Sequence, residues 1–201
     1  MLFNWFNKSK QILLENDELL LRSLQKKDYL QWEHVRSNSK DFLTPFEPRW
    51  GEKSLSKQNF LRRIRYFNRQ AALGQGFSFS IWKKTNAAQV LVGGLSLTNI
   101  RHLSGHVNLG YWVGESDKNK GIMSLAVALT LPFIFNSLGL CRIHAACLPS
   151  NIASRKVLEK NGFCEEGFAK NYLQIDGVWQ DHVLYALTLE EYRDGNINEA
   201  S

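Results

Sequence analysis

Residues 109–135 read LGYWVGESDKNKGIMSLAVALTLPFIF and predict a strand, a short charged loop and a helix in succession. The preceding residues 106–113 alternate apolar and polar side chains, which is typical of a strand. Residues 121–138 form an apolar, helix-like run, in which Pro132 is expected to cause a kink or an early end. The central question is why two lysines and a glycine stand at the turn into this helix.

An anion-binding turn answers this question. The first backbone N–H groups of a helix have no partner within the helix, and the helix dipole is positive at that end. Gly121 allows a phosphate to approach the backbone closely, and Lys118 and Lys120 add positive charge. The loop therefore predicts a phosphate cradle, although a lysine–glycine pattern of this kind is weak when taken alone.

The rest of the chain predicts a mixed α/β (α+β) fold with a strand–helix–strand unit at its middle. Gly93 and Gly94 indicate a bulge, and Asp176-Gly177 indicates a hairpin turn. Residues 42–50, FLTPFEPRW, predict a loop whose aromatic side chains line a binding wall. The expected strands are 19–24, 77–83, 89–97, 106–113, 141–147, 165–174 and 179–189, and the expected helices are 26–36, 54–72, 121–138 and 151–160.

Length and composition suggest one domain with a real core. The chain has 201 residues, 44% of them apolar, and a net charge of +6, which favours an acidic partner such as nucleic acid, a ribosome, an anionic membrane or a polyanionic cofactor. Its three cysteines have no zinc spacing, so we expect no metal site and a reducing compartment. No targeting segment is visible at the N-terminus, and the longest apolar run is too short to span a bilayer, so we expect a cytoplasmic protein.

Three blocks of sequence resemble the GNAT N-acetyltransferase superfamily, and within it the RimJ/RimL group. The acyl-CoA loop of that superfamily reads Gln/Arg-x-x-Gly-x-Gly/Ala, and Lys118, Gly121 and Met123 stand at its three fixed positions. Lysine keeps the positive charge but lacks the two-pronged arginine fork, and methionine at the small position is similar to the RimJ/RimL group. The other blocks are NIASRKVLEKNGF at 151–163 and EGFAKNY…DGVWQDH at 166–182. The resemblance covers about residues 17–192.

The resemblance implies a six- to seven-stranded mixed sheet with splayed central strands, about four flanking helices, and acetyl-CoA as acyl donor. It divides the chain into an extension at 1–16, an acetyltransferase domain at 17–192 and a tail at 193–201. The implied donor site uses main-chain groups of Trp112 and Val113 for the pantetheine arm, the cradle for the pyrophosphate, and Asn151 for the arm of CoA. The cradle residues are Lys118, Asn119, Lys120, Gly121, Ile122 and Met123.

The resemblance also implies catalytic and acceptor residues. A backbone N–H near Tyr111 or Trp112 would polarise the acetyl carbonyl, as an oxyanion hole does. Ser154 matches a serine close to the CoA sulfur and would donate a proton to the leaving thiolate. A water chain is the preferred route for the amine proton, with His106 as a weaker candidate base. Phe46, Trp50 and Asp181 are the residues expected on the acceptor side, although Asp181 could instead fix a loop.

Direct transfer from acetyl-CoA to the amine is favoured over an acyl-cysteine route. A free α-amino group has a pKa of about 7.7–8.0, so it deprotonates without a strong base. Nothing near Cys147 in the sequence would lower the pKa of its thiol.

The resemblance implies that the acceptor is the N-terminal alanine of a small-subunit ribosomal protein, with contact to the small ribosomal subunit as a further expectation. Three alternatives stay open: a small-molecule amine as acceptor, a ribosome-assembly protein that binds through the arginine-rich face at 62–69 and retains the acyl-CoA site, or an RNA-binding protein with stacking aromatics at Phe77 and Phe79. We expect no membrane partner and no specific DNA, and both a monomer and a homodimer are compatible with the sequence.

Overall fold

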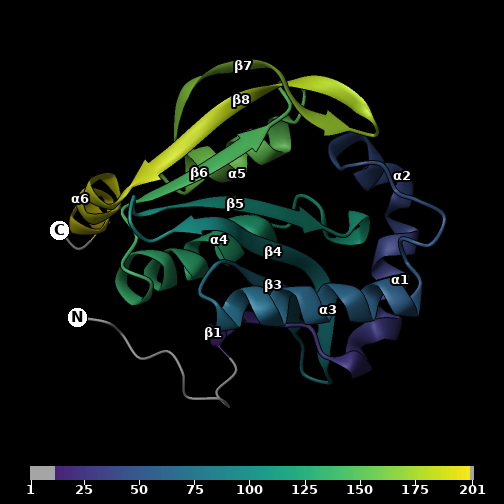
Figure 1. The fold of residues 1–201 in the computed structure, drawn as a ribbon. Helices are drawn as coiled ribbons and strands as arrows, with labels where there is room; N and C mark the ends of the chain where they lie inside the picture. The colour runs from purple at the N-terminus through teal and green to yellow at the C-terminus, as the bar shows by residue number, and fades with distance from the viewer. Residues whose placement is uncertain (1–11, 200–201) are drawn as a thin grey trace.

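The structure is a computed structural model that describes residues 12–199. One eight-stranded sheet runs through the molecule in the order β1-β2-β3-β4-β5-β6-β8-β7, and β5 and β6 are its parallel neighbours (Figure 1). The strands are β1 Leu13–Glu15, β2 Leu19–Arg22, β3 Phe77–Lys84, β4 Gln89–Arg101, β5 His106–Val113, β6 Arg142–Cys147, β7 Cys164–Ile175 and β8 Val178–Thr188. The α-helices are α1 Tyr29–Asn38, α2 Lys40–Leu43, α3 Lys57–Ala72, α4 Ile122–Pro132, α5 Ile152–Lys160 and α6 Leu189–Glu199.

The predicted mixed α/β fold is confirmed, with more elements than the sequence suggested. The described residues hold eight strands and six α-helices, where six to seven strands and about four helices were expected. β1 was missed because three residues are too few to show an alternating pattern, and it lies within the stretch predicted to be an N-terminal extension, of which residues 1–11 lie outside the described residues. α2 begins just before the region predicted as a loop, residues 42–50, and ends inside it.

The C-terminal helix α6 was also missed and starts at the end of β8. Its Tyr192 ring stacks on Phe135 with ring centroids 4.8 Å apart, and Leu189 and Tyr192 pack against the main core. The sequence of α6 is polar over most of its length, and this explains why no helical pattern was visible. The domain limits at residues 17 and 192 stay a prediction.

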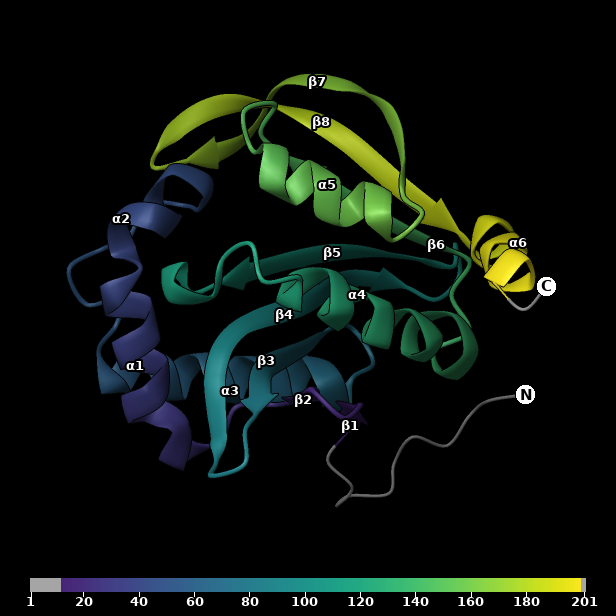
Figure 2. The ribbon, with the colours of Figure 1, turned by 180° about the vertical axis from the view of Figure 1, so that it is seen from behind.

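Helices cover the two faces of the sheet separately (Figure 2). α4 and α5 lie on one face, and α1 and α3 lie on the other. The main core lies under α4, where Val107 and Leu109 of β5 are buried together with Val127 and Ile134. A smaller cluster on the α1 face is built around Trp82. The two groups of helices therefore pack against the same central strands from opposite sides.

Pro132 ends α4, as the sequence predicted. The chain continues as a π-helical turn over Phe133–Ser137, closed by the bond from the Leu138 N–H to the Phe133 carbonyl at 2.9 Å. At the other end of α4, Gly121 has φ +74° and stands at the N-cap position. A side chain rarely adopts this left-handed conformation, which accounts for glycine at this point of the loop.

The parallel strands β5 and β6 separate soon after they meet. They pair only through His106, Val107 and Asn108 of β5. Beyond Asn108, the edge of β5 that faces β6 has no strand neighbour within residues 12–199, and this produces the splayed pair that the sequence led us to expect.

The tip of the β7–β8 hairpin returns to the N-terminal half of the chain near α2 (Figure 1). Asp176 and Gly177 form the predicted turn, with φ +45° and +82°. The Asp176 N–H donates to the Glu47 carbonyl at 2.9 Å, and Arg49 forms an ion pair with the Asp176 carboxylate. The hairpin therefore bridges the open end of the splayed strands. No helix among residues 12–199 has both the length and the apolar character needed to cross a bilayer.

Candidate active site

The loop between β5 and α4 presents backbone N–H groups at a helix start. The first intrahelical bond runs from the Leu125 N–H to the Gly121 carbonyl at 3.1 Å, so the N–H groups before Leu125 point out of the helix. Within the described chain, no side chain caps this end of α4. An added Cβ at Gly121 would meet nothing within 4 Å, so the space in front of the helix is open. This geometry suits an anion.

The two lysines of the loop are paired locally. Lys118 Nζ lies 2.9 Å from Glu115 Oε1, and Lys120 Nζ lies 3.0 Å from Asp117 Oδ1. All four side chains are at least partly exposed, and exposed ion pairs contribute little to stability. A polyanion can therefore compete for both ammonium groups. Their predicted role in phosphate binding is compatible with this arrangement and stays a prediction.

A tyrosine and a serine meet at the opening between β5 and β6. The Tyr111 hydroxyl lies 3.0 Å from Ser154 Oγ and also donates to the Ser154 carbonyl at 3.1 Å. Burial raises the pKa of Tyr111, against the smaller opposing effect of the Ser154 hydrogen bond. The hydroxyl therefore stays protonated at neutral pH and keeps a proton that it can donate. The sequence assigned Tyr111 a backbone role alone, and only the fold reveals its hydroxyl beside Ser154.

Asn151 and Cys147 hold Ser154 in place. The Asn151 side chain caps α5 by accepting from the Ser154 N–H at 3.1 Å. Cys147, at the end of β6, is hydrogen bonded to Ser154, and burial raises the pKa of its thiol. A thiol with a raised pKa is a poor nucleophile at neutral pH. This favours direct transfer over an acyl-cysteine.

His106 lies far from the Tyr111–Ser154 pair. A strand rises about 3.3 Å per residue, so five residues separate His106 from Tyr111 by roughly 17 Å along β5. Its ring packs against His144 with centroids 5.5 Å apart. Partial burial and the charge of Arg142 lower the pKa of His144. The structure thus brings Tyr111 and Ser154 together but leaves the candidate base His106 at the other end of the strand.

Trp112 and Val113 lie on the part of β5 that has lost contact with β6. Their other edge pairs with Gly94 and Gly93 of β4. The main-chain groups toward β6 are therefore available to an extended ligand arm, which is the role that was predicted for these two residues. That role remains a prediction.

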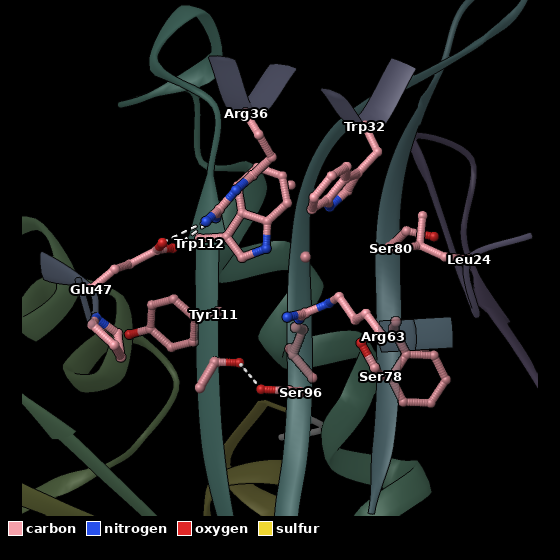
Figure 3. A pocket seen from close by; sticks show the side chains of 16 residues that line it. Leu24, Trp32, Arg36, Glu47, Arg63, Ser78, Ser80, Ser96, Tyr111 and Trp112 are labelled. Atoms are coloured by element: carbon pink, nitrogen blue, oxygen red, sulfur yellow. Dashed lines mark hydrogen bonds and ion pairs between the residues drawn. The ribbon is translucent and has the colours of Figure 1, made fainter. Parts of the chain in front are cut away.

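A cavity of about 260 Å³ opens on the α1/α3 face of the same strands (Figure 3). Its floor is made of small residues: Ser78, Ser96 and Gly110 are cross-strand neighbours on β3, β4 and β5. A Cβ at Gly94 would lie 2.6 Å from Trp112 Nε1, so glycine is required beside that indole. The predicted bulge is confirmed by a register shift opposite Gly93. The walls of the cavity are contributed by Leu24, Trp32, Arg36, Glu47, Pro48, Arg63, Tyr111 and Trp112.

An arginine clamp forms one wall of this cavity. Arg36 donates to both Glu47 oxygens, at 2.7 and 2.5 Å, and its guanidinium lies 4.3 Å from the Trp50 ring and 4.6 Å from the Trp112 ring. Trp50 Nε1 also donates to Glu47 at 2.9 Å. Trp50, which was predicted to bind acceptor, therefore supports the clamp behind the cavity wall. The sequence analysis did not predict Arg36 or Glu47 as site residues. The aromatic loop beside them was the one sequence feature that pointed to this region.

The two other predicted acceptor residues lie outside this cavity lining. Phe46 is 37% exposed on the surface near the clamp. Asp181 accepts a hydrogen bond from the Asn171 N–H at 2.8 Å, where Asn171 has φ +46° and the β7–β8 register is irregular. Asp181 thus fixes the β7 irregularity, which is the structural role that the sequence left open for it. Contact of either residue with an acceptor stays a prediction.

Replacing Glu47 with alanine is expected to lower the free energy of unfolding by about 2 kcal/mol. The substitution leaves the Arg36 guanidinium, with a side chain only 13% exposed, without its carboxylate partner, and an unpaired charge of this kind is costly. Glu15→Ala is the control, because it breaks the more exposed Lys84–Glu15 pair and should cost less than about 1 kcal/mol. Urea unfolding measures the free energy of unfolding of both variants. Equal losses of free energy in the two variants would contradict a buried ion pair between Arg36 and Glu47.

The open helix start, the splayed parallel strands and the part-buried hydroxyl pair beside them together form the candidate site. Residues 18–164 match the acetyltransferase (GNAT) domain family, and the chain belongs to this family and is an acetyltransferase. It is 29% identical to the [ribosomal protein uS5]-alanine N-acetyltransferase of Escherichia coli (strain K12), over 96% of this chain and all of that protein.

Solved structures show the same similarity. The ribosomal-protein-S5-alanine acetyltransferase of Vibrio fischeri is 28% identical and superposes with a TM-score of 0.82, covering 90% of this chain and 98% of that one. RimJ of Mycobacterium smegmatis, solved in complex with CoA-disulfide, is 31% identical with a TM-score of 0.81, over 91% of this chain and 87% of that one.

Proposed function

We propose that this acetyltransferase transfers the acetyl group of acetyl-CoA directly to the N-terminal α-amine of a ribosomal protein that begins with alanine. The observation that carries the proposal is the Tyr111–Ser154 pair beside the splayed strands, because Tyr111 also lines the cavity on the α1/α3 face. The uS5-alanine N-acetyltransferase from Escherichia coli and its Vibrio fischeri counterpart support this acceptor. The reaction would take place in the cytoplasm, where such an acceptor is made.

The donor would approach from the α4 side. Its pyrophosphate would lie on the N–H groups before Leu125, with Lys118 and Lys120 leaving their weak ion pairs to contact it. Its pantetheine arm would take the place of the missing strand beside Trp112 and Val113. The amide nitrogen of Asn151 would contact the arm, because the amide oxygen already caps α5. The CoA complex of the Mycobacterium smegmatis neighbour supports CoA as the carrier.

The acceptor would approach from the α1/α3 side. The neutral amine attacks the thioester carbonyl, a backbone N–H of β5 stabilises the developing oxyanion, and the carbon–sulfur bond then breaks. The nitrogen loses a proton to solvent as the amide forms, the Tyr111 hydroxyl gives its proton to the leaving thiolate, and Tyr111 regains a proton from solvent. Because the α-amine has a pKa of about 7.7–8.0, a large fraction is already neutral at physiological pH, and loss of its remaining proton to solvent needs no strong base. Positioning of the two reactants then supplies much of the rate enhancement.

A thiol-release assay tests the proposal. The purified protein is mixed with acetyl-CoA and with a peptide that carries the N-terminal sequence of ribosomal protein uS5, and a matched peptide with a blocked N-terminus is the control. We expect release of CoA thiol and a mass increase of one acetyl group only with the free peptide. Turnover on a polyamine or an aminoglycoside, with none on the peptide, would overturn the protein acceptor and favour a small-molecule amine.

A further inference from the structure

The acceptor cavity contains one positive charge without a partner. Three charged residues line it, and Arg36 and Glu47 neutralise each other in their two-bonded pair. Arg63 of α3 makes no hydrogen bond and no ion pair within the part of the chain that the structure describes, and its nearest ring is Phe67 at 5.1 Å. Figure 3 shows its guanidinium extending into the middle of the cavity, between Trp112 and Ser96.

The surroundings of Arg63 favour an incoming anion. The side chain as a whole is exposed, but its guanidinium end is the part that the cavity walls enclose. Burial lowers the pKa of Arg63, and the positive charge of Arg36 lowers it further by a smaller amount. The charge of Glu47 raises this pKa, and its effect is the smallest of the three. An arginine stays charged in proteins even with such a shift. A carboxylate in the cavity would relieve both effects.

The donor cannot be the partner of this arginine. α3 lies on the sheet face opposite to α4, whereas the anion-binding helix start belongs to α4 (Figures 1 and 2). The phosphates of CoA would therefore be on the far side of the sheet from Arg63. The same cavity is lined by Tyr111, so a molecule that fills it contacts both Tyr111 and Arg63.

We propose that Arg63 is a specificity-determining residue that binds a carboxylate of the acceptor, so that the preferred acceptor carries an acidic side chain close to its N-terminal amine. The proposal rests on the proposed function. The planar guanidinium fork matches a carboxylate with two hydrogen bonds. Ser78, on the floor beside it, can donate a further hydrogen bond, whereas the Ser96 hydroxyl already donates to the Gly110 carbonyl at 3.3 Å. A cavity of about 260 Å³ is near the small end of ligand pockets, roughly 300–1,000 Å³, so it holds the first residues of a chain.

The test compares acceptor peptides that begin with alanine and carry a single glutamate at position 2, 3 or 4, each against the same peptide with glutamine. An extended chain rises about 3.3 Å per residue, so these positions cover the reach of the cavity. We expect at least one glutamate peptide to show a kcat/KM about tenfold or more above its glutamine partner. In Arg63→Gln, this preference should disappear because the glutamate peptide falls to the glutamine level.

Arg62→Gln is the matched control. Arg62 is the neighbouring arginine on α3, is exposed, and donates to Asn59 Oδ1 at 3.2 Å outside the cavity lining. It should keep the full glutamate preference. Equal kcat/KM for every glutamate and glutamine pair, or an equal loss for all peptides in Arg63→Gln, would overturn the proposal while leaving α-amine transfer intact. The second result would mean that Arg63 binds the peptide main chain.

A binding measurement separates this proposal from failure of the proposed function. Trp32 and Trp112 line the cavity, so their fluorescence reports a bound peptide in the presence of CoA without any turnover. Tighter binding of a glutamate peptide, lost in Arg63→Gln, would support the carboxylate site even if no peptide were acetylated. No fluorescence response to any peptide would overturn it.

Discussion

Tyr111→Phe is expected to lower kcat by about 10²- to 10³-fold while changing the KM for acetyl-CoA less than about threefold. The substitution removes only the hydroxyl that lies 3.0 Å from Ser154 Oγ. A positioned proton donor is worth about 10²–10⁴ in rate, because it acts in the transition state and not in the bound ground state. Steady-state kinetics with the uS5 peptide, with acetyl-CoA varied at saturating peptide, measure both parameters.

Two further variants sharpen this prediction. Ser154→Ala should lose less than Tyr111→Phe, because Tyr111 keeps its bond to the Ser154 carbonyl and can still donate a proton. Tyr66→Phe is the control, since Tyr66 is 56% exposed on α3 and outside the cavity lining. A Tyr111→Phe enzyme with normal kcat and normal thermal stability would show that water supplies the proton.

The dependence of kcat/KM on pH tests the protonation state of the Tyr111 hydroxyl. Burial raises the pKa of Tyr111 above its ordinary value of about 10, so the donor stays protonated throughout the usual assay range. The logarithm of kcat/KM should therefore rise as the acceptor amine deprotonates toward pH 8 and then stay level to about pH 10. A decrease that starts below pH 10 would mean that the essential acid has a lower pKa than this buried tyrosine.

Gly121→Asp is expected to raise the Kd of acetyl-CoA about 30-fold or more relative to Gly121→Asn. Both side chains enter open space and both tolerate φ +74° better than other residues, so the two variants differ only in charge. A carboxylate about 5 Å from a phosphate repels it by roughly 3 kcal/mol at an effective dielectric constant of 20, and solvent exposure reduces this value. Calorimetric titration with CoA gives the two dissociation constants.

The stability of these variants should change in the opposite direction. Asp and Asn both cap a helix by accepting from its free N–H groups, and a negative charge also favours the positive end of the helix dipole. Gly121→Asp should therefore unfold at the same temperature as Gly121→Asn or a higher one. Weaker CoA binding together with a lower melting temperature would point to damage of the loop, and equal affinities would place the pyrophosphate elsewhere.

The features that sequence alone predicted are local in the chain. The predicted cradle is built from consecutive residues, and the sequence places Gly121 at the helix start, where the structure shows a positive φ. The Asp176-Gly177 turn, the end of α4 at Pro132 and the Gly93 bulge follow in the same way from the conformations that these residues allow. β1 and α6 were not predicted, because β1 is too short and α6 is too polar to show a repeating apolar pattern in the sequence.

Tertiary structure alone decided which side chains meet. Tyr111 and Ser154 are 43 residues apart and come together only because β5 and β6 separate beneath α5. The acceptor cavity draws its walls from α1, α3, the loop after α2 and three strands, so its charge pattern has no counterpart in any one segment. Arg63 illustrates the difference between sequence and tertiary structure, because the sequence of α3 predicts a solvent-exposed face of arginines. Packing of α3 against the sheet places this one arginine in the cavity, whereas backbone preferences act within a few residues and determine only the elements themselves.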